Sequence, residues 1–424
     1  MQRELHSRAF LATKLANDNN KVFVFEHTYF DRVGWPSDGI YIGKNCFRTE
    51  IPHNLKYYDK MKDANIKIWF LDEEGGVYIG NNKKVWESEL AKRFDYTKLH
   101  SDDKIFFWGN WQRNFYEKKS LKPQTYITGS PNFDICQKKY LKVFKEYDLK
   151  ITGGRKDYVL INTRFANGNS RNGKYFGLSN SSYSKYHTKN ELMGRFLENN
   201  IMIFHFIRLI REIALNLPKE LFILRPHPAE DVKIYSKLLS DIANVIIVND
   251  KSSIEPWLRQ CKVLIHNGCS TAIQAAVAEK KIISFLPETQ QDNFSPGLPN
   301  TIGFLARNID DVLNHLGEKD EKAYNNIWKD TISNLDSINY ISDILAKEEY
   351  NASKNYKLNF SIKERLKELI EVFVRKILNR SFRSKYTDIQ GISEFPLLID
   401  IANKYYKSEI KCIKISETCY LVKK

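Results

Sequence analysis

The first 310 residues of the chain alternate between short apolar runs and longer polar stretches that repeat apolar positions at helical spacing. The apolar runs lie at 21–25, 66–71, 104–108, 124–128, 158–162, 221–224, 245–248, 263–265 and 282–285. The clearest helical stretches lie at 4–16, 192–217, 231–243, 254–260 and 271–279. Short buried strands that alternate with helices are typical of parallel β-α units, so the pattern predicts an α/β fold with doubly wound sheets.

The length of 424 residues exceeds what one hydrophobic core usually holds, so we expect two domains. We place the first at 1–150 and the second at 151–310, with a linker at 150–157, where two glycines interrupt the pattern. Residues 166–189 are rich in Asn, Ser, Gly and Tyr and predict a long, lid-like loop. Residues 311–424 are expected to form a helical, basic extension.

The extension contains a predicted amphipathic helix at 362–381, whose apolar side chains share one face while Lys and Arg crowd the other. The apolar stripe consists of Ile362, Leu366, Leu369, Ile370, Phe373 and Ile377. From residue 351 onward there are 16 Lys and Arg against 8 Asp and Glu, a net +8 within a chain of net charge +15. Such a surface fits an anionic membrane, a nucleic acid or an anionic substrate. The alternative is a helix that packs on the first domain with a solvated basic face.

Composition narrows the class of protein. The mean hydropathy is −0.48 and no apolar run approaches the length of about 18 residues typical of a membrane-spanning helix, so we expect none. Residues 1–16 lack the uninterrupted apolar core of a signal peptide, which favours a cytoplasmic protein, or one bound peripherally at the inner face of the plasma membrane. The six cysteines form no CxxC pair, so we expect free thiols and no metal site.

Two segments combine polar side chains with the end of a predicted strand, where open α/β sheets bind their ligands. In the first, prolines on both sides of His227 fix the backbone, and a fixed imidazole near the Arg225 guanidinium suits a phosphate. The second opens a helix, whose first amides and hydroxyls suit an anion. The candidate phosphate ligands are Arg225, His227, Pro228, Asn267, Gly268, Ser270 and Thr271. Each segment alone also fits an ordinary turn or helix cap.

Carboxylates follow two strands of the first domain. Asp72, Glu73 and Glu74 come directly after the run at 66–71, and mutual repulsion among these three carboxylates would raise the pKa of one and equip it as a general acid or base. The alternative is a solvated acidic turn. Asp134 follows the run at 124–128 and is either catalytic or an acid favoured by a helix dipole.

Weaker candidates lie in the second domain. Glu255 and Gln274 are candidates for contacts with a nucleoside ribose, and Asn162, Thr163 and Arg164 follow a strand and would line the same cleft. The sequence contains no GxxxxGK[ST], GxGxxG, HExxH or GxSxG motif. This argues against a P-loop kinase, a Rossmann dehydrogenase, a zincin or an α/β-hydrolase.

The acidic pair, the HP turn and the Ser-Thr helix start together resemble the three short motifs of bacterial GT-B sialyltransferases, which use CMP-activated sugars. The wider pattern is similar to bacterial surface carbohydrate biosynthesis proteins of the β-Kdo transferase type. The stretches that carry this likeness are Arg3–Leu5, Leu71–Gly75, Thr128–Asp134, Leu224–Pro228 and Asn267–Thr271, and it covers roughly residues 1–310. The chain departs from the pattern at Cys269, where sialyltransferases have Ser, and at Ser130, where related sequences often carry Asn.

The resemblance implies a GT-B fold, with two Rossmann-like domains facing a cleft, the donor nucleotide on the second, and neither cofactor nor metal. It implies proton transfer by Glu73 or Glu74 and a nucleophilic role for Asp134. The implied reaction moves Kdo or a related ulosonic acid from a CMP-sugar to a glycan or lipid-linked acceptor, in the synthesis of capsule or lipopolysaccharide. The basic helix at 362–381 would dock such an enzyme on anionic lipid.

Other classes remain open. A CDP-glycerol-type polyol-phosphate transferase or a UDP-sugar 2-epimerase would share the architecture, and the first of these also carries an HP turn. A non-enzymatic, basic nucleic-acid-binding protein is supported by charge alone. The sequence contains no recognisable RNA or DNA module and no stripe of alternating aromatic and basic residues, so we expect no nucleic-acid partner.

Overall fold

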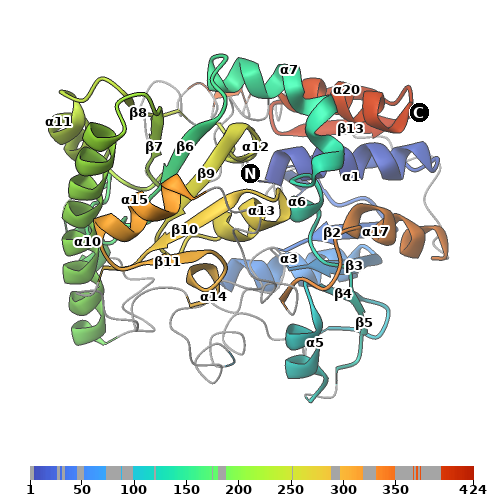
Figure 1. The fold of residues 1–424 in the computed structure, drawn as a ribbon. Coiled ribbons are helices and arrows are strands. Elements are labelled where there is room, and N and C mark those ends of the chain that lie inside the picture. The colour runs from blue at the N-terminus through green and yellow to red at the C-terminus, as the bar shows by residue number, and fades with distance from the viewer. Residues whose placement is uncertain are drawn as a thin grey trace. The chain divides into compact units, whose positions relative to one another are not determined.

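The structure is a computed structural model, and the chain divides into two compact units. One unit comprises Met1–Gly76, Trp86–Ile135 and Lys329–Lys424, and the other comprises Val77–Val85 and Cys136–Trp328. Figure 1 shows the elements of both units. The structure describes residues 4–25, 29–30, 34–44, 52–72, 87, 99–118, 121–173, 175–179, 188–250, 252–287, 297–318, 331–348, 366, 369–370, 373 and 393–424.

The second unit is built on a six-stranded sheet, parallel throughout, with the order β11-β10-β9-β6-β7-β8. Its strands are β6 (Tyr158–Asn162), β7 (Phe222–Arg225), β8 (Val245–Ile247), β9 (Cys261–His266), β10 (Lys281–Phe285) and β11 (Phe304–Ala306). The chain winds outward from β6 to β8, returns to β9 on the other side of β6, and winds outward again to β11. This reversal confirms the predicted doubly wound sheet and creates a switch point between β6 and β9.

Helices cover both faces of this sheet. The helical elements are η3 (Lys138–Tyr140), α7 (Leu141–Thr152), α8 (Phe176–Ser179), α10 (Lys189–Asn216), α11 (Lys233–Leu239), α12 (Glu255–Gln260), α13 (Thr271–Val277), α14 (Gly297–Asn300) and α15 (Ile309–Gly317). Successive side chains of a strand point to opposite faces. Val159 and Ile161 join the core formed with α10, α11 and α15, whereas the Tyr158 hydroxyl donates to the Trp257 carbonyl of α12 at 2.8 Å on the opposite face.

The first unit contains a four-stranded parallel sheet with the order β2-β3-β4-β5. Its elements are β2 (Gly39–Gly43), α3 (Pro52–Asp63), β3 (Ile66–Leu71), β4 (Lys104–Phe107), α5 (Asn110–Glu117), β5 (Gln124–Ile127) and α6 (Pro131–Asp134). The three strands from β3 to β5 were predicted. The strand β2 was missed because it is short and carries a glycine at each end, and glycine is depleted in strands.

A helical layer and a small antiparallel sheet complete this unit. They comprise α1 (Leu5–Asn17), β1 (Val22–Phe25), α17 (Ser337–Ala346), α20 (Phe395–Tyr406), β12 (Lys411–Ser416) and β13 (Cys419–Lys423). The predicted strand at 21–25 exists as β1, but it pairs antiparallel with β13 and lies outside the parallel sheet. Ten of the 13 residues of α1 are buried, because α20, α17, α6 and β13 surround it.

The division of the chain differs from the expected boundaries at 150 and 310. The glycines of the expected linker end α7 instead, and Gly153 has a φ of 61°, the left-handed conformation that commonly terminates a helix. Residues from 329 onward belong to the first unit, and their described part ends in the hairpin β12-β13 rather than in helices alone. The antiparallel pairing of β1 with β13, which are remote in sequence, joins the end of the chain to the first unit.

Two expectations concern membranes. Within the part of the chain that the structure describes, no helix is both long and apolar enough to cross a bilayer. Of the predicted helix at 362–381, the structure describes Leu366, Leu369, Ile370 and Phe373, which are helical and between 52% and 62% exposed. The apolar stripe expected there is therefore exposed at these four positions.

A buried ion pair joins two helices on one face of the six-stranded sheet. Arg259 of α12 donates two hydrogen bonds of 2.7 and 2.8 Å to the carboxylate of Asp148 in α7, and neither side chain is exposed. The guanidinium also stacks on the ring of Phe144, 4.0 Å from its centroid. Burial raises the pKa of Asp148, and the positive charge of Arg259 opposes that rise. Because both charges are out of water, each depends on the other.

We expect Arg259→Met to lower the free energy of unfolding by about 3–5 kcal/mol, since it strands a buried carboxylate. The loss should be larger at pH 8 than at pH 5, because Asp148 can take up a proton in acid. Urea unfolding at both pH values measures it. The double variant Asp148→Leu/Arg259→Met should recover most of the loss, and a double variant as unstable as the single one would contradict this account.

Candidate functional site

A row of polar side chains crosses the carboxyl edge of the six-stranded sheet. Arg225 of β7 pairs in register with Asn162 of β6, Asn162 with His266 of β9, and His266 with Ser284 of β10. Paired residues of neighbouring strands point to the same face, here the face covered by α12 and α13. The residues that precede this row in the strands are apolar and buried. The row therefore lies at the switch point, where a doubly wound sheet binds its ligand.

Within this row, His266 is fixed in one neutral form. Its Nδ1 accepts the amide of Cys269 at 3.3 Å, so the ring proton belongs on Nε2, which lies 3.1 Å from the Ser284 hydroxyl. The residue is fully buried, and burial lowers its pKa to about 3. The imidazole thus orders the loop between β9 and α13 and carries no charge near neutral pH.

Two atoms of the row lack a hydrogen-bond partner among the residues that the structure describes. Asn162 is 4% exposed, and its Nδ2 donates to the Thr271 hydroxyl at the start of α13 at 3.0 Å. Its Oδ1 has no hydrogen-bond partner among these residues. In Arg225, the terminal Nη2 donates to the carbonyl of Ser252, whereas the buried Nε has no hydrogen-bond partner among these residues. Burial lowers the pKa of this guanidinium, and Asp250, at 3.8 Å, opposes that effect. An anion at this edge would supply both a hydrogen-bond acceptor and a counter-charge for Arg225.

The HP turn is held by a residue that the sequence analysis missed. The buried carboxylate of Glu230 accepts hydrogen bonds from the Thr163 hydroxyl and the amides of Phe165 and His227, and its other oxygen accepts the Tyr235 hydroxyl. These bonds tie the loop after β6 and the turn after β7 to α11. The only sequence signal was an acid shortly after His227 in the same turn.

His227 itself is exposed at the tip of the turn. Its Nδ1 accepts the amide of Ala229 at 3.2 Å, which leaves the proton on Nε2 in the neutral ring, so this edge is a hydrogen-bond donor. Pro226 is buried and Pro228 is exposed on either side of it. The predicted role of the prolines, to hold the imidazole in place, fits this geometry.

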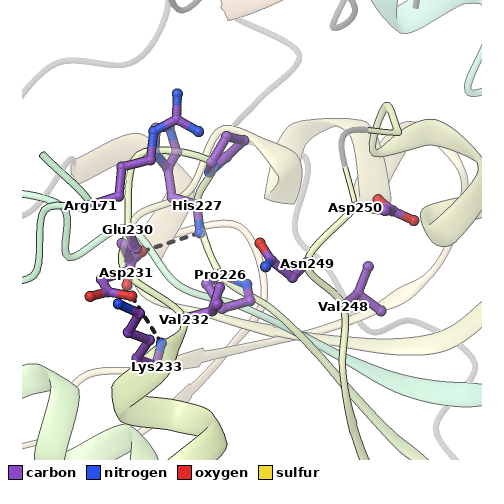
Figure 2. Close-up of a pocket in the computed structure, with 11 residues that line it drawn as sticks. Arg171, Pro226, His227, Glu230, Asp231, Val232, Lys233, Val248, Asn249 and Asp250 are labelled. Atoms are coloured by element: carbon purple, nitrogen blue, oxygen red, sulfur yellow. Dashed lines mark hydrogen bonds between the residues drawn. The ribbon is translucent and has the colours of Figure 1, made fainter. Parts of the chain in front are cut away.

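A pocket of about 320 Å³ opens beside the HP turn, within the size range of small-ligand sites. The turn, the start of α11 and residues Val248–Asp250 line it, together with Arg171 from the loop predicted at 166–189. Figure 2 shows Arg171 beside His227, with Asn249 and Asp250 on the other side of the turn. The loop is pinned there, because the Arg171 amide donates to the Ala229 carbonyl at 3.0 Å. Arg171 was not among the predicted site residues.

The helix start after β9 uses its polar groups in two ways. The Asn267 side chain is buried and donates to the Phe285 carbonyl at 2.8 Å, and the Gly268 amide donates to the Asn300 side chain. Gly268 has a φ of 64°, which favours glycine at this turn. These two predicted ligands shape the loop. Ser270 is half-buried and caps no amide among the described residues, and Thr271 contacts Asn162, so these two lie at the switch point.

The residues predicted to contact ribose lie together. Gln274 of α13 donates to the carboxylate of Glu255 in α12 at 3.3 Å, and Glu255 is fully buried. Burial raises the pKa of Glu255, while Arg259 and Arg225 oppose that rise. The carboxylate is thus electrostatically linked to the guanidinium at the end of β7. Its contact with a ribose stays a prediction.

The acidic candidates of the first unit have different outcomes. Glu73 and Glu74 lie outside the described residues. Asp134 is fully buried, and its Oδ2 accepts the amide of Ile338 at 2.7 Å, in the first turn of α17. This is the geometry of a carboxylate that stabilises a helix N-terminus, although of a different helix from the one expected. This bond gives Asp134 a structural role, and its role as a nucleophile stays a prediction.

No group of three or more His, Cys, Asp or Glu is arranged to hold a metal ion within the described ranges. The described cysteines are free: Cys136, Cys261 and Cys419 are buried, and Cys269 and Cys412 are half-buried. Burial raises the pKa of the Cys261 and Cys412 thiols to about 12, so neither is a thiolate at neutral pH.

No protein-family model and no curated protein sequence matches this chain. Solved structures do resemble it. UDP-GlcNAc 2-epimerase from Methanocaldococcus jannaschii, with UDP-GlcNAc and UDP, has a TM-score of 0.41 and 12% identity over 73% of this chain and 76% of its own. For UDP-GlcNAc 2-epimerase from Neisseria meningitidis the TM-score is 0.43 and the identity 13%, over 73% of this chain and 76% of that chain. For the wall teichoic acid polymerase TagF the TM-score is 0.41 and the identity 12%, over 67% of this chain and 68% of that chain. These values are too low to carry an inference about function, which has to come from the residues of this chain.

Replacing Glu230 should loosen the HP turn, because four donors lose one shared acceptor. We expect Glu230→Ala to lower the free energy of unfolding by at least about 2 kcal/mol, given the cost of leaving buried donors unpaired. Tyr235→Phe removes one of these bonds and should cost less, about 1 kcal/mol. Urea unfolding compares the two variants. An alanine variant as stable as the wild type would refute the clamp.

Acid should weaken the fold through His266. The unfolded imidazole titrates near 6.5 and the folded one near 3, so between these values the unfolded state binds more protons. Lowering the pH through this window removes at most about 1.4 kcal/mol of stability per pH unit. His266→Asn keeps an acceptor for the Cys269 amide and should show a shallower loss than the wild type between pH 6.5 and 4.5. Equal slopes in urea unfolding would count against this assignment.

Proposed function

We propose that this chain is an enzyme, a glycosyltransferase that binds a nucleotide-activated sugar at the carboxyl edge of the six-stranded sheet. The donor proposed is a CMP-linked sugar, Kdo or a related ulosonic acid. The acceptor proposed is a glycan or lipid-linked glycan of a bacterial surface polysaccharide. The observation that carries the proposal is the polar row at the switch point, where Arg225 Nε and Asn162 Oδ1 have no partner among the described residues. The first is a donor that suits a phosphate oxygen, and the second is an acceptor that suits a sugar or ribose hydroxyl.

The chemistry of these residues suits a departing nucleotide. Cleavage of the bond between sugar and phosphate leaves negative charge on the phosphate oxygens, and preorganised donors stabilise that charge. The Arg225 guanidinium lies at the end of β7, and His227 presents its Nε2 edge at the tip of the following turn. Ser270 and Thr271 begin α13, where amides and the helix dipole also favour an anion.

The remaining roles follow the sequence analysis. Glu73 or Glu74 is proposed to take the proton from the attacking hydroxyl. Asp134 is a weaker candidate for a nucleophile, because its burial and its bond to Ile338 fit a structural role. Glu255 and Gln274 are proposed to contact the ribose. No cofactor or metal is included in the proposed reaction.

The proposed membrane partner is an anionic surface bound through 362–381. The four described residues of its stripe are exposed, as an interfacial helix requires. The Lys and Arg of this segment would add attraction to anionic lipid. This would hold the enzyme near a lipid-linked acceptor.

A different donor is the second candidate. The HP turn and the helix start would bind the phosphates of CDP-glycerol or of a UDP-sugar by the same chemistry. The acidic pair, which favours the CMP-sugar, lies outside the described residues. The nucleotide that the chain binds most tightly would therefore distinguish a CMP-sugar donor from CDP-glycerol or a UDP-sugar.

The test is the shift in melting temperature of the purified chain with CMP, CDP, UDP and GDP. A ligand at 100 times its Kd adds about 2.7 kcal/mol to the stability of the folded state. We expect the largest shift with CMP, and its loss in His227→Ala and in Asn162→Asp. The second variant is nearly isosteric and keeps a partner for the Thr271 hydroxyl. It places a negative charge beside Arg225, its partner in register, and this charge would repel the proposed phosphate.

His100→Ala, an exposed histidine of the other unit, is the matched control and should keep the wild-type shift. A preference for CDP or UDP would select the second candidate. The absence of any nucleotide shift, or a shift unchanged in both site variants, would reject the proposed donor site.

A further inference from the structure

The chain just before Arg171 runs beside the HP turn as a short antiparallel ladder. The Asn169 side chain donates to the Asp231 carbonyl at 2.8 Å, and the Asp231 amide donates back to the Asn169 carbonyl at 2.9 Å. Ser170 and Glu230 form an antiparallel bridge between these contacts and the Arg171 amide, which donates to the turn. These bonds fix the backbone of Arg171 without using its side chain, and so leave the guanidinium available.

The Arg171 side chain differs from most arginines of the second unit. It is exposed, and it forms no hydrogen bond or ion pair with any residue in the described part of the chain. Other arginines of this unit donate to a backbone carbonyl or a carboxylate, namely Arg155, Arg208, Arg211, Arg225, Arg259 and Arg307. Figure 2 shows Arg171 beside His227 at the pocket next to the HP turn. An unpaired guanidinium at the edge of a pocket suits an anionic ligand.

The pocket combines cations without partners and carboxylates that already bind the chain. Lys233 lines it from α11, and its ammonium also has no partner among the residues that the structure describes. Asp231 accepts the Lys233 amide at 3.0 Å, and Asp250 accepts the amide and the hydroxyl of Ser252 at 3.0 and 2.6 Å. The buried Glu230 accepts the four donors described above. The unpaired charges at the pocket are therefore positive.

His227 connects the pocket with the polar row. It follows Arg225, the end of the row on β7, by two positions, and it lies beside Arg171. A donor whose phosphate contacts Arg225 and His227 would have one of the two groups attached to that phosphate near Arg171. The ribose is proposed to lie at Glu255 and Gln274, on α12 and α13, so the group on the other side of the phosphate is left for Arg171.

Both candidate classes of donor carry a negative charge on this other group. In a CMP-ulosonic acid, the anomeric carbon that is bonded to the phosphate also carries a carboxylate. In a nucleoside diphosphate, a second phosphate follows the first. Either donor would therefore present a second anionic group to the pocket.

We propose that Arg171 is a specificity residue of the donor site and binds a second anionic group of the donor, a carboxylate or a second phosphate. This role depends on the proposed function, because the first phosphate has to lie at the polar row. A guanidinium donates two parallel hydrogen bonds to either group, which an ammonium does not. The ladder holds the arginine in place before the ligand arrives, and this reduces the entropy lost on binding.

Isothermal titration calorimetry with CMP, CDP and CMP-N-acetylneuraminic acid, at one fixed salt concentration, tests this role. CMP lacks the second anionic group, so Arg171→Gln should leave its Kd nearly unchanged. The same variant should raise the Kd of CDP, of the CMP-sugar or of both by about tenfold or more, the loss expected when a hydrogen bond between charged groups is removed. A loss confined to the CMP-sugar assigns the group to a carboxylate, and a loss confined to CDP assigns it to a second phosphate.

Two further variants serve as controls. Lys237→Gln removes the same charge from an exposed position of α11 outside the pocket, and should leave all three Kd values unchanged. Arg171→Lys keeps the charge but not the paired donors, so its Kd for the affected ligand should fall between those of the wild type and Arg171→Gln.

The results separate this role from the proposed function. An equal loss for all three ligands in Arg171→Gln, or no loss for any of them, would overturn the role of Arg171 while the nucleotide site stands. A wild type that binds CMP but neither larger ligand would do the same. A wild type that binds none of the three would reject the proposed function, and the role of Arg171 would fall with it.

Discussion

The parallel pairing of β6 with β9 is the constraint on which the candidate site depends. Because the chain leaves β6 in one direction and returns to its other side, the connections after these two strands diverge toward opposite faces. In doubly wound sheets, connections that diverge in this way leave a crevice at the carboxyl ends of the two strands, and polar side chains there can bind a ligand. Asn162 and His266 occupy this place as paired residues, and Thr271 brings the start of α13 against them.

The buried polar groups around this point fall into two kinds. His266, Asn267 and Glu230 use their hydrogen bonds on the backbone of neighbouring loops, and so give those loops one conformation. Asn162 and Arg225 each retain a buried atom without a partner in the described part of the chain. Buried polar atoms are rarely left unpaired, because each costs free energy. His266, Asn267 and Glu230 therefore shape the candidate site, whereas Asn162 and Arg225 each have an atom that a bound ligand would pair.

Much of the architecture could be predicted from periodicity. Most strands of both parallel sheets are short apolar runs, and the long helix α10 shows apolar residues at helical spacing. The failures have physical causes. The glycine-flanked β2 lacks the composition of a strand, and β1 looks like any buried strand although its partner is β13 at the far end of the chain. At the candidate site, the place of Arg225 and Thr271 after strand ends was predictable from the sequence. Glu230 was missed because an acid in a polar turn gives no sign that it accepts four hydrogen bonds.

The sequence by itself determined the α/β class, the positions of most strands, and the placing of the HP turn and the Ser-Thr helix start at strand ends. These are local properties, set by the spacing of apolar residues and by proline and cap chemistry. Only the tertiary structure decided that residues after 329 join the first unit, that Asp134 serves α17, and that Asn267 turns inward. Each of those outcomes depends on which buried donor or strand edge lies opposite, and such pairings join residues too far apart in sequence for local patterns to reveal.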